Sequence, residues 1–452
     1  MSQNLPKPMT RILKVPEREL GKFKDGEGQE KLGLWEVSQS ESPSVKILHE
    51  AADYLKTKDI PVGFPTETVY GLGADATRSA AVKGIYAAKG RPSDNPLIIH
   101  ISDLEMLRNI LAPVPENTAN GTSDTGHDRI PEIYKPLIDK FWPGPLTILL
   151  PNPTPSKLAP EVTAGLKTFG VRMPKSPLAL SLIKLTGAPL AAPSANASTK
   201  PSPTTAEHVL EDLDGRIELI LDGGSCLVGV ESTVVDGLCD PPVILRPGGV
   251  SIDELRSCAG WEKVERGYKD QSELGKSAPR APGMKYKHYS PKAKVVLYEA
   301  TFSSGKEGVQ SADIDLFIQD HKSLHPQVEN KVLQVGIIRT RYWKPAAGLR
   351  CGDFKTQETV KTGTEQESQE TVELDVQEAD LYDATGEATI GKLMDVSIGE
   401  DTRSIAQGLF SALRELDRRG ADIIFVEGTL DDQDIGAAVM NRLRKAASEI
   451  KS

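Results

Sequence analysis

The chain contains little of what several common protein classes require. Only four of its 452 residues are cysteines, and none belongs to a CxxC pair. This argues against a disulfide framework and a structural zinc site, and it fits a reducing compartment. Aromatic residues make up 5% of the chain and form no cluster of the kind that stacks RNA bases. The sequence therefore predicts neither a disulfide-rich protein nor a stacking RNA binder.

Long apolar runs are absent as well. No apolar segment reaches the roughly 18 residues that a membrane-spanning helix needs, and the N-terminal segment has no apolar signal core. That segment carries Lys7, Arg11 and Lys14 before its first acidic residue, Glu17. We therefore expect no membrane association and a cytoplasmic protein. A mitochondrial pool is the alternative that this basic N-terminus leaves open.

Positive charge is not in excess either, because the net charge is −10 and the pI is about 5.4. The acidic net charge disfavours nucleic-acid binding through bulk charge, but it does not exclude a local basic pocket.

His321 and His325 lie four residues apart, but polar neighbours predict a loop or a helix end rather than a metal site. The segment "GEATIGKL" (386–393) has P-loop spacing but ends in leucine instead of the serine or threonine that holds Mg²⁺. We expect no dedicated metal site.

Strand-like and helix-like segments alternate along most of the chain, which predicts an α/β fold. In the second half, strands alternate with helices in the manner of a doubly wound parallel sheet. We predict a flexible N-terminal tail at 1–40, a first domain at 41–265 with an insertion at about 112–129, a connector at 266–292, and a second domain at 293–452 with an acidic loop at about 355–380.

The segment "KGRPSDNPL" (89–97) has the composition of an anion-binding loop. Lys89 and Arg91 are two residues apart, so their side chains lie on one side of an extended segment. Arginine offers a planar fork and lysine a point charge to phosphate oxygens. Two prolines lower the entropy cost of holding this geometry. A solvated basic turn is the alternative for this segment taken alone.

Two further arginines lie on apolar strands. Arg172 stands between valine and methionine in "KTFGVRMP" (167–174), where an arginine needs a carboxylate from the protein or from a ligand. Arg246 ends the strand-like run "PVILRPGGV" (242–250) beside a glycine turn, a suitable place for a phosphate. Both the structural ion pair and the ligand clamp remain open for Arg172.

Short polar side chains follow other predicted strands. Thr68 lies in "FPTETVYGLGADA" (64–76), Ser194 and Asn196 lie in "APLAAPSANASTKPSPT" (188–204), and Ser232 lies in "GVESTVVDG" (229–237). Hydroxyl and amide groups supply neutral hydrogen bonds. Together with the four basic residues, they predict a pocket for a polyanion and a small polar co-substrate.

The ordered blocks "PTETVYGLGADA", "KGRPSDNPL", "FWPGPLT", "VRMP", "PSAN…PSPT", "ESTVVD" and "LRPGG" resemble the YrdC/Sua5 family. The connector "APGMKYKHYSP" and the second α/β region are similar to its two-domain Sua5 branch, and the insertion and acidic loop indicate a eukaryotic member, such as a fungal one. The resemblance implies a twisted, mostly parallel α/β sheet with a large positive cavity, followed by a smaller Rossmann-like domain.

The activity that the resemblance implies is L-threonylcarbamoyladenylate synthesis. Such enzymes join L-threonine, bicarbonate and ATP, and they release pyrophosphate. Their product serves the N6-threonylcarbamoyl modification of adenosine 37 in tRNAs that read ANN codons, which implies a functional link to the tRNA threonylcarbamoyl-transfer machinery. We expect Mg²⁺ to enter with ATP. The sequence leaves direct tRNA binding, the oligomeric state and the role of the second domain undecided.

The resemblance also implies site residues, block by block. The catalytic set is Lys89, Arg91, Ser194 and Asn196. The residues implied for ATP are Arg91, Asn95, Thr168, Ser194, Ser202 and Arg246, with Tyr286, His288 and Tyr289 from a connector that closes over the cavity. The residues implied for threonine are Thr68, His100, Arg172, Ala192 through its backbone, and Ser232.

Two positions depart from the family pattern. Ser176 stands where the family often has histidine, and Thr199 stands where it often has glycine, which leaves the shape of the "PSPT" loop open. A different function class, an RNA-binding module without synthase activity, is the alternative. The acidic net charge and the scattered aromatic residues count against it.

Overall fold

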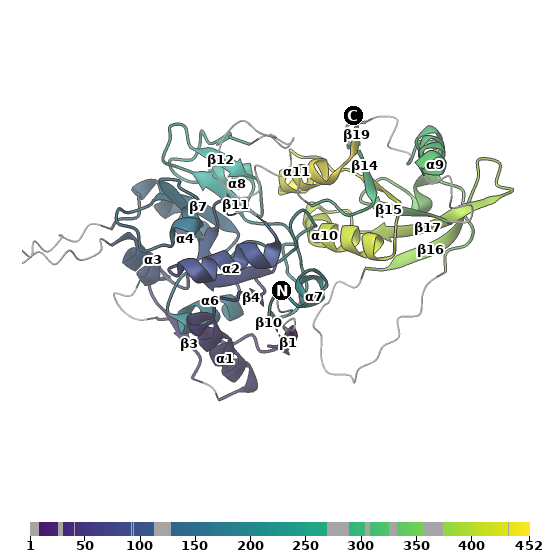
Figure 1. Cartoon of the computed structure of the whole chain (residues 1–452). Helices are drawn as coiled ribbons and strands as arrows, with labels where there is room; N and C mark the ends of the chain where they lie inside the picture. The colour runs from purple at the N-terminus through teal and green to yellow at the C-terminus, as the bar shows by residue number, and fades with distance from the viewer. Residues whose placement is uncertain are drawn as a thin grey trace, which may run out of the picture. The chain divides into compact units, whose positions relative to one another are not determined.

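The computed structural model describes residues 9–25, 30–39, 41–91, 93, 95–112, 128–268, 289–302, 308–324, 332–355, 374–432 and 434–452. The chain divides into two compact units (Figure 1). The first comprises Met1–Ser198 and Ser202–Tyr286, and the second comprises Thr199–Pro201 and Lys287–Ser452. Each unit has its own β-sheet.

The sheet of the first unit has eleven strands among the described residues. Five neighbouring pairs are parallel and five are antiparallel. In spatial order the strands are β1 (Arg11–Lys14), β10 (Leu219–Asp222), β4 (Val62–Phe64), β5 (Gly71–Asp75), β9 (Leu190–Ala191), β6 (Ile98–His100), β8 (Thr168–Arg172), β7 (Leu146–Pro151), β11 (Thr233–Asp236), β12 (Val243–Arg246) and β13 (Glu265–Arg266).

This architecture confirms the α/β class, but the pairing is mixed where a mostly parallel sheet was expected. The physical reason lies in the connections. Only residues 65–70 join β4 to β5, and only residues 237–242 join β11 to β12. A parallel pair needs a crossover of a dozen or more residues, so both of these pairs are antiparallel.

Helices pack against both faces of this sheet. Helices α1 (Pro43–Thr57) and α6 (Pro177–Thr186) share a core with Leu219 and Leu221 of β10, whereas Ile220 between them belongs to the main core. Successive strand residues point to opposite faces, so the two cores lie on opposite sides. The main core takes in α2 (Ser79–Lys89), α3 (Leu104–Leu111), α4 (Lys135–Phe141), α5 (Pro160–Thr163), α7 (Ala206–Leu213) and α8 (Ile252–Arg256).

The N-terminal segment differs from the prediction of a flexible tail. Strand β1 extends the first sheet beside β10, and β2 (Gly21–Phe23) pairs with β3 (Trp35–Val37). Buried side chains anchor this segment, with Leu20 and Trp35 1% and 5% exposed. The tail prediction is therefore wrong for residues 9–25 and 30–39, because a few well-spaced apolar residues suffice to dock short strands.

The sheet of the second unit is parallel except at one edge. Its order is β16 (Val376–Tyr382), β17 (Thr389–Ser397), β15 (Leu333–Arg339), β18 (Ile423–Glu427), β14 (Lys294–Tyr298) and β19 (Glu449–Lys451), and only the β16–β17 hairpin is antiparallel among the described pairs. Helices α9 (Ser311–Leu324), α10 (Thr402–Arg418) and α11 (Gly436–Ala446) connect the strands. The parallel sheet predicted here is confirmed.

Three predicted segments fall largely outside the described residues. They are the insertion, the connector and the acidic loop, of which 113–127, 269–288 and 356–373 are not described. The predicted end of the acidic loop is wrong, because β16 already begins at Val376 and pairs with β17. The predicted domain limits at 265 and 292 stay predictions. In the described part of the chain, no helix has both the length and the apolar character needed to cross a membrane.

Candidate active site

Strands β6 and β8 carry three of the predicted site residues, His100, Thr168 and Arg172, and the register of the two strands places them. The two strands run parallel, with His100 opposite Arg172 and Ile98 opposite Gly170. His100 and Arg172 therefore project from the same face at the carboxyl ends of the strands. Thr168 begins β8, four residues or about 13 Å before Arg172. The candidate site therefore has two ends, one at Thr168 and the other at His100 and Arg172.

Beside β8, the face that carries these residues holds a small apolar cluster. Ile98 of β6, Leu149 of β7, Val234 of β11 and Leu245 of β12 form that cluster, while the alternate residue Ile99 points into the main core. Polar side chains at the ends of these strands thus have a compact apolar floor. Such a combination is typical of a small-molecule site.

Asn95 lies at the amino end of β6 and is completely buried. Neither its amide nitrogen nor its amide oxygen has a hydrogen-bond partner among the described residues. A buried polar group without a partner costs about 1–3 kcal/mol, which makes a ligand contact the better explanation of this side chain. By the β6–β8 register, Thr168 lies at the same end.

Lys89, the last residue of α2, brings the predicted catalytic motifs together. Its Nζ donates to the carbonyl oxygens of Ser194 and Asn196 at 2.5 and 2.7 Å. The Ser194 hydroxyl donates to Asn196 Oδ1 at 2.5 Å. The helix ends at Gly90, whose left-handed φ of 62° turns the chain toward Arg91. The ammonium group of Lys89 thus holds the loop that follows β9.

Arg91 follows Gly90 directly. Its guanidinium carbon lies 5.9 Å from the centre of the Tyr86 ring. The Tyr86 hydroxyl lies 2.7 Å from the backbone oxygen of Asn95 and can donate to it, and this fixes the turn. Lys89 is helical and Gly90 has a left-handed φ, so the single extended segment expected for Lys89 and Arg91 is wrong.

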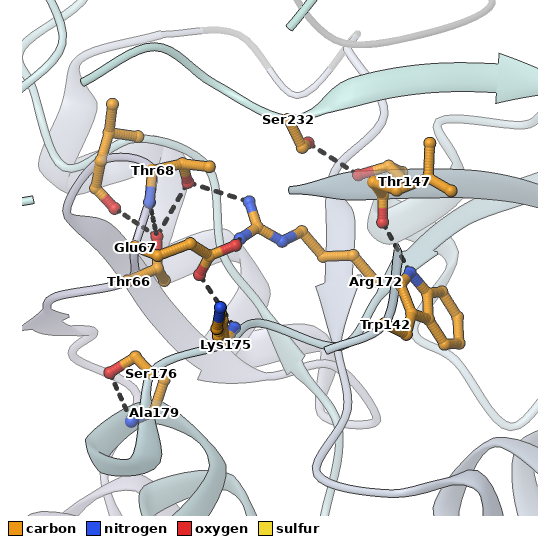
Figure 2. Close-up of polar contacts among 12 residues, drawn as sticks. Thr66, Glu67, Thr68, Trp142, Thr147, Arg172, Lys175, Ser176, Ala179 and Ser232 are labelled. Carbon is orange, nitrogen blue, oxygen red and sulfur yellow. Dashed lines mark hydrogen bonds and ion pairs between the residues drawn. The ribbon is translucent and has the colours of Figure 1, made fainter. Parts of the chain in front are cut away.

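Arg172 and Thr68 are in direct contact at the other end of the site. Arg172 Nη1 donates to Thr68 Oγ1 at 2.9 Å, and Nη2 donates to a carboxylate oxygen of Glu67 (Figure 2). The structural ion pair that the sequence left open for Arg172 is therefore present. Arg172 Nε is buried and has no partner among the described residues, so a ligand role remains a prediction.

His100 is buried beside Arg172, and its Nδ1 has no partner among the described residues. The ring meets Phe64 edge to face, with centroids 6.4 Å apart. Burial, reinforced by the positive charge of Arg172, holds the pKa of His100 well below its usual range. The imidazole is therefore neutral near pH 7.

Ser232 and Arg246 are joined through β11 and β12. Arg246 Nε donates to the Ser232 carbonyl oxygen at 3.1 Å, and Nη2 donates to Ser232 Oγ at 3.1 Å. Ser232 Oγ lies 2.8 Å from Thr147 Oγ1 of β7 (Figure 2). Gly248 permits this arrangement, because a Cβ there would lie 2.2 Å from the backbone nitrogen of Thr233.

For the remaining predicted residues, the structure gives contacts that do not point to a ligand, or gives no description. Ser202 is buried, and its hydroxyl donates to a carboxylate oxygen of Glu231 at 2.6 Å. The backbone N–H of Ala192 donates to Ile98, so a ligand contact through this backbone would use its carbonyl oxygen. Tyr286 and His288 lie outside the described residues. Tyr289 stacks on Phe410 of α10 within the second unit, with ring centroids 5.2 Å apart, and its role toward ATP stays a prediction.

The two positions that depart from the family pattern have local roles. Ser176 caps α6, with its hydroxyl accepting from the backbone N–H of Ala179 at 3.3 Å. Thr199 has a φ of 78°, a left-handed value that favours glycine and explains why glycine suits this position.

Sequence reasoning missed two buried carboxylates, Glu67 and Glu231. Both lie in quoted motifs, but neither was assigned a role. A signal did exist for Glu67, because an arginine on an apolar strand demands a carboxylate partner. Among the described residues, no group of three or more His, Cys, Asp or Glu side chains could hold a metal ion.

Comparisons with known proteins match the chain along nearly its whole length. Residues 55–248 match a family described as "Telomere recombination", and residues 250–448 match the C-terminal domain of threonylcarbamoyl-AMP synthase. The threonylcarbamoyl-AMP synthase of Schizosaccharomyces pombe is 44% identical over 92% of this chain and 91% of its own length. The Bacillus subtilis enzyme of the same name is 39% identical over 91% and 96%.

The chain belongs to the threonylcarbamoyl-AMP synthase family. The resemblance predicted from the ordered motifs, with its two-domain branch, is thereby confirmed. A crystal structure of Pyrococcus abyssi Sua5 with L-threonine is similar across 98% of this chain and 99% of that one, at 34% identity and a TM-score of 0.66. Membership of this family indicates an ATP-using nucleotidyltransferase.

We expect replacement of Asn95 by leucine to separate stability from function. Leucine has a similar volume and no buried polar atoms to satisfy, so the free energy of unfolding should stay unchanged or rise by up to about 1 kcal/mol. The KM for ATP should rise about tenfold, because a hydrogen-bonding pair to the nucleotide is lost. Urea unfolding and steady-state kinetics test this, with the KM for threonine as the internal control. A marked loss of stability with an unchanged KM for ATP would show that Asn95 is structural.

The depressed pKa of His100 predicts how stability depends on pH. The folded chain keeps His100 neutral, whereas the unfolded chain binds a proton below about pH 6.5. The unfolded state then binds more protons, so stability falls as the pH decreases from 7, by up to about 1.4 kcal/mol at pH 5.5. His100→Asn should flatten this slope in urea unfolding at pH 7, 6 and 5.5. The exposed His49 of α1 is the control, since His49→Asn should leave the slope unchanged. Equal slopes for His100→Asn and the unmodified chain would contradict the prediction.

Proposed function

We propose that the chain joins L-threonine, bicarbonate and ATP to L-threonylcarbamoyladenylate, with release of pyrophosphate and water. The observation that carries this proposal is the pair of buried, unsatisfied groups at the two ends of β6 and β8. Asn95 offers an amide at one end, and His100 with Arg172 offers an imidazole and a guanidinium N–H at the other. A nucleotide and an amino acid held at these ends would lie next to each other.

The reaction consists of two bond-forming steps. The amine of threonine attacks the carbon of bicarbonate, water leaves, and a carbamate results. A carbamate oxygen then attacks the α-phosphorus of ATP, and the bond to the pyrophosphate leaving group breaks. Negative charge accumulates on phosphoryl oxygens and on the leaving group, so fixed cations lower the barrier.

The residues of the site divide between these tasks in our proposal. Lys89 and Arg91 face the phosphates, with Ser194 and Asn196 ordering the adjoining loop. Asn95, Thr168, Ser202 and Arg246 hold ATP, which enters with its Mg²⁺ as one substrate. Thr68, His100, Arg172, Ala192 and Ser232 hold threonine. Because no residue is assigned as a strong general base, catalysis rests mainly on proximity and on electrostatic stabilisation.

The biological setting belongs to the same proposal. The product serves N6-threonylcarbamoyladenosine formation at position 37 of ANN-decoding tRNAs, in the cytoplasm. Mixed anhydrides of this kind hydrolyse in water, so the next step must be a transferase that takes the threonylcarbamoyl group to tRNA. We expect that enzyme to work close to this one.

A substrate-omission assay tests the proposed function. The purified chain should release pyrophosphate when threonine, bicarbonate and ATP are all present, and not when any of them is left out. Release of pyrophosphate that is indifferent to threonine would overturn the proposal. Salt-dependent RNA binding without nucleotide turnover would favour the RNA-binding module instead.

A further inference from the structure

The guanidinium group of Arg172 is held by two side chains from the loop between β4 and β5. Figure 2 shows it lying between Glu67 and Thr68, with hydrogen bonds to both. The side chains of Arg172 and Glu67 are only 4% and 7% exposed. Because desolvation offsets much of the attraction in a buried ion pair, the geometry that the pair imposes explains it better than stability does.

Glu67 is itself fixed at both ends. Its second carboxylate oxygen accepts a hydrogen bond from the backbone N–H of Lys175 at 3.0 Å. Its backbone carbonyl oxygen accepts from the N–H of Val228 at 2.8 Å. Glu67 therefore connects its own loop with the segment after β8 and with the loop before β11. A carboxylate held this way can fix the orientation of the arginine side chain that it binds.

Thr68 is oriented by a short chain of hydroxyl groups. The hydroxyl of Thr66 lies 2.7 Å from the carbonyl oxygen of Val69 and donates its proton there. The hydroxyl of Thr68, 2.8 Å from Thr66 Oγ1, then donates to that oxygen and keeps its lone pairs for Arg172. Thr68 is thereby an acceptor toward Arg172, as Glu67 is.

These two acceptors each take one N–H group of Arg172, one on Nη1 and one on Nη2. Nη1 and Nη2 each have a protein partner, whereas Nε is buried without one among the described residues. Nδ1 of His100, which lies opposite Arg172 on the neighbouring strand β6, is also buried without a partner among the described residues. A carboxylate oxygen of an amino acid would satisfy Nε, and an N–H or O–H group of the same molecule would satisfy an unprotonated Nδ1.

We propose that Glu67 is the positioning residue of the threonine site: it locks the Arg172 guanidinium so that Nε faces the substrate carboxylate. This inference rests on the proposed function. Glu67 also offsets the positive charge of Arg172. The Arg172–Glu67 pair carries no net charge and His100 is neutral, so these three groups suit a zwitterionic amino acid. Arg246, which donates to Ser232, adds a positive charge nearby.

The variant Glu67→Gln tests the proposal, because it keeps the shape and removes the charge. We expect its KM for threonine to rise by ten- to a hundredfold, while the KM for ATP changes less than twofold. Glu67→Asp keeps the charge but is one methylene shorter and cannot reach Arg172 and the Lys175 N–H together. Its KM for threonine should lie between those of Glu67→Gln and the unmodified chain.

Inorganic phosphate supplies a readout that a merely structural residue would not affect. In Glu67→Gln, the positive charge of Arg172 is no longer compensated and should attract phosphate. At subsaturating threonine, the phosphate concentration that inhibits this variant should be at least fivefold lower than for the unmodified chain. Asp103→Asn is the matched control, since Asp103 is a fully buried, ion-paired carboxylate bound to Lys184 in the same unit. That variant should lose stability without changing either the KM for threonine or the inhibition by phosphate.

Two results would overturn the inference. One is a Glu67→Gln variant whose KM values for threonine and ATP rise together, as expected when a fold is loosened. The other is unchanged inhibition by phosphate. If Glu67→Gln does not fold, the KM values of Glu67→Asp decide: a KM for threonine that does not rise, or that rises together with the KM for ATP, would overturn the inference. Titration of threonine into the unmodified chain distinguishes failure of this inference from failure of the proposed function. If the unmodified chain does not bind threonine, the proposed function is contradicted rather than the role of Glu67.

Discussion

Replacement of Lys89 by methionine is expected to lower kcat/KM for ATP by at least about a thousandfold. The ammonium group is buried at the end of α2 and donates to the carbonyl oxygens of Ser194 and Asn196. In the proposed mechanism, methionine removes a fixed cation that faces the phosphates. It also removes two charge-assisted hydrogen bonds that hold the loop after β9. Positioning and electrostatic stabilisation are therefore lost together.

Steady-state release of pyrophosphate measures this effect, with circular dichroism to confirm that the variant is folded. Lys83→Met is the control on the same helix, because Lys83 is largely exposed and pairs with Glu161 at 3.2 Å on the surface. It should retain activity within about twofold, as surface ion pairs contribute little. A folded Lys89→Met variant with more than about a tenth of the original activity would contradict the role of Lys89.

Replacement of Arg172 by methionine should have the largest effect on stability. It leaves the Glu67 carboxylate buried without its cation, which costs about 3–5 kcal/mol of unfolding free energy. It should also reduce kcat/KM for threonine by at least about a hundredfold, because charge-assisted hydrogen bonds to the substrate carboxylate are lost. Urea unfolding and kinetics with varied threonine measure the two effects separately.

The double variant Arg172→Met, Glu67→Gln separates stability from function. Removing both charges should restore much of the lost stability, since a buried ion pair can be replaced by uncharged groups at little cost. Threonine use should stay low, because no guanidinium remains. An Arg172→Met variant as stable as the unmodified chain, or a double variant with restored threonine use, would contradict this account.

The sequence predicted those parts of the fold and the site that depend on local patterns. Helix α2 and its end at Gly90 follow from apolar spacing and a glycine stop. The strands that carry His100 and Arg172 follow from apolar runs between turn-forming residues. The role of Lys89, Arg91 and Asn95, inferred from charge and proline spacing, stays a prediction. Each of these signals is contained in about a dozen residues.

The features that escaped prediction depend on contacts between distant segments. Glu67 and Arg172 are 105 residues apart, and the sequence around one residue does not identify the other as its partner. Strand β1 becomes a strand only because β10 lies beside it. The antiparallel pairs of the first sheet involve strands as short as the two residues of β9, too short for a periodic signal. Tertiary context, rather than local propensity, decides such elements.

We propose above that the chain forms one molecule from L-threonine, bicarbonate and ATP. The most direct test uses ¹³C-labelled bicarbonate and identifies the nucleotide product by mass spectrometry immediately after mixing. We expect an adenylate that contains threonine and one ¹³C atom, formed in step with pyrophosphate. Formation of AMP or ADP without incorporation of ¹³C and threonine would contradict it.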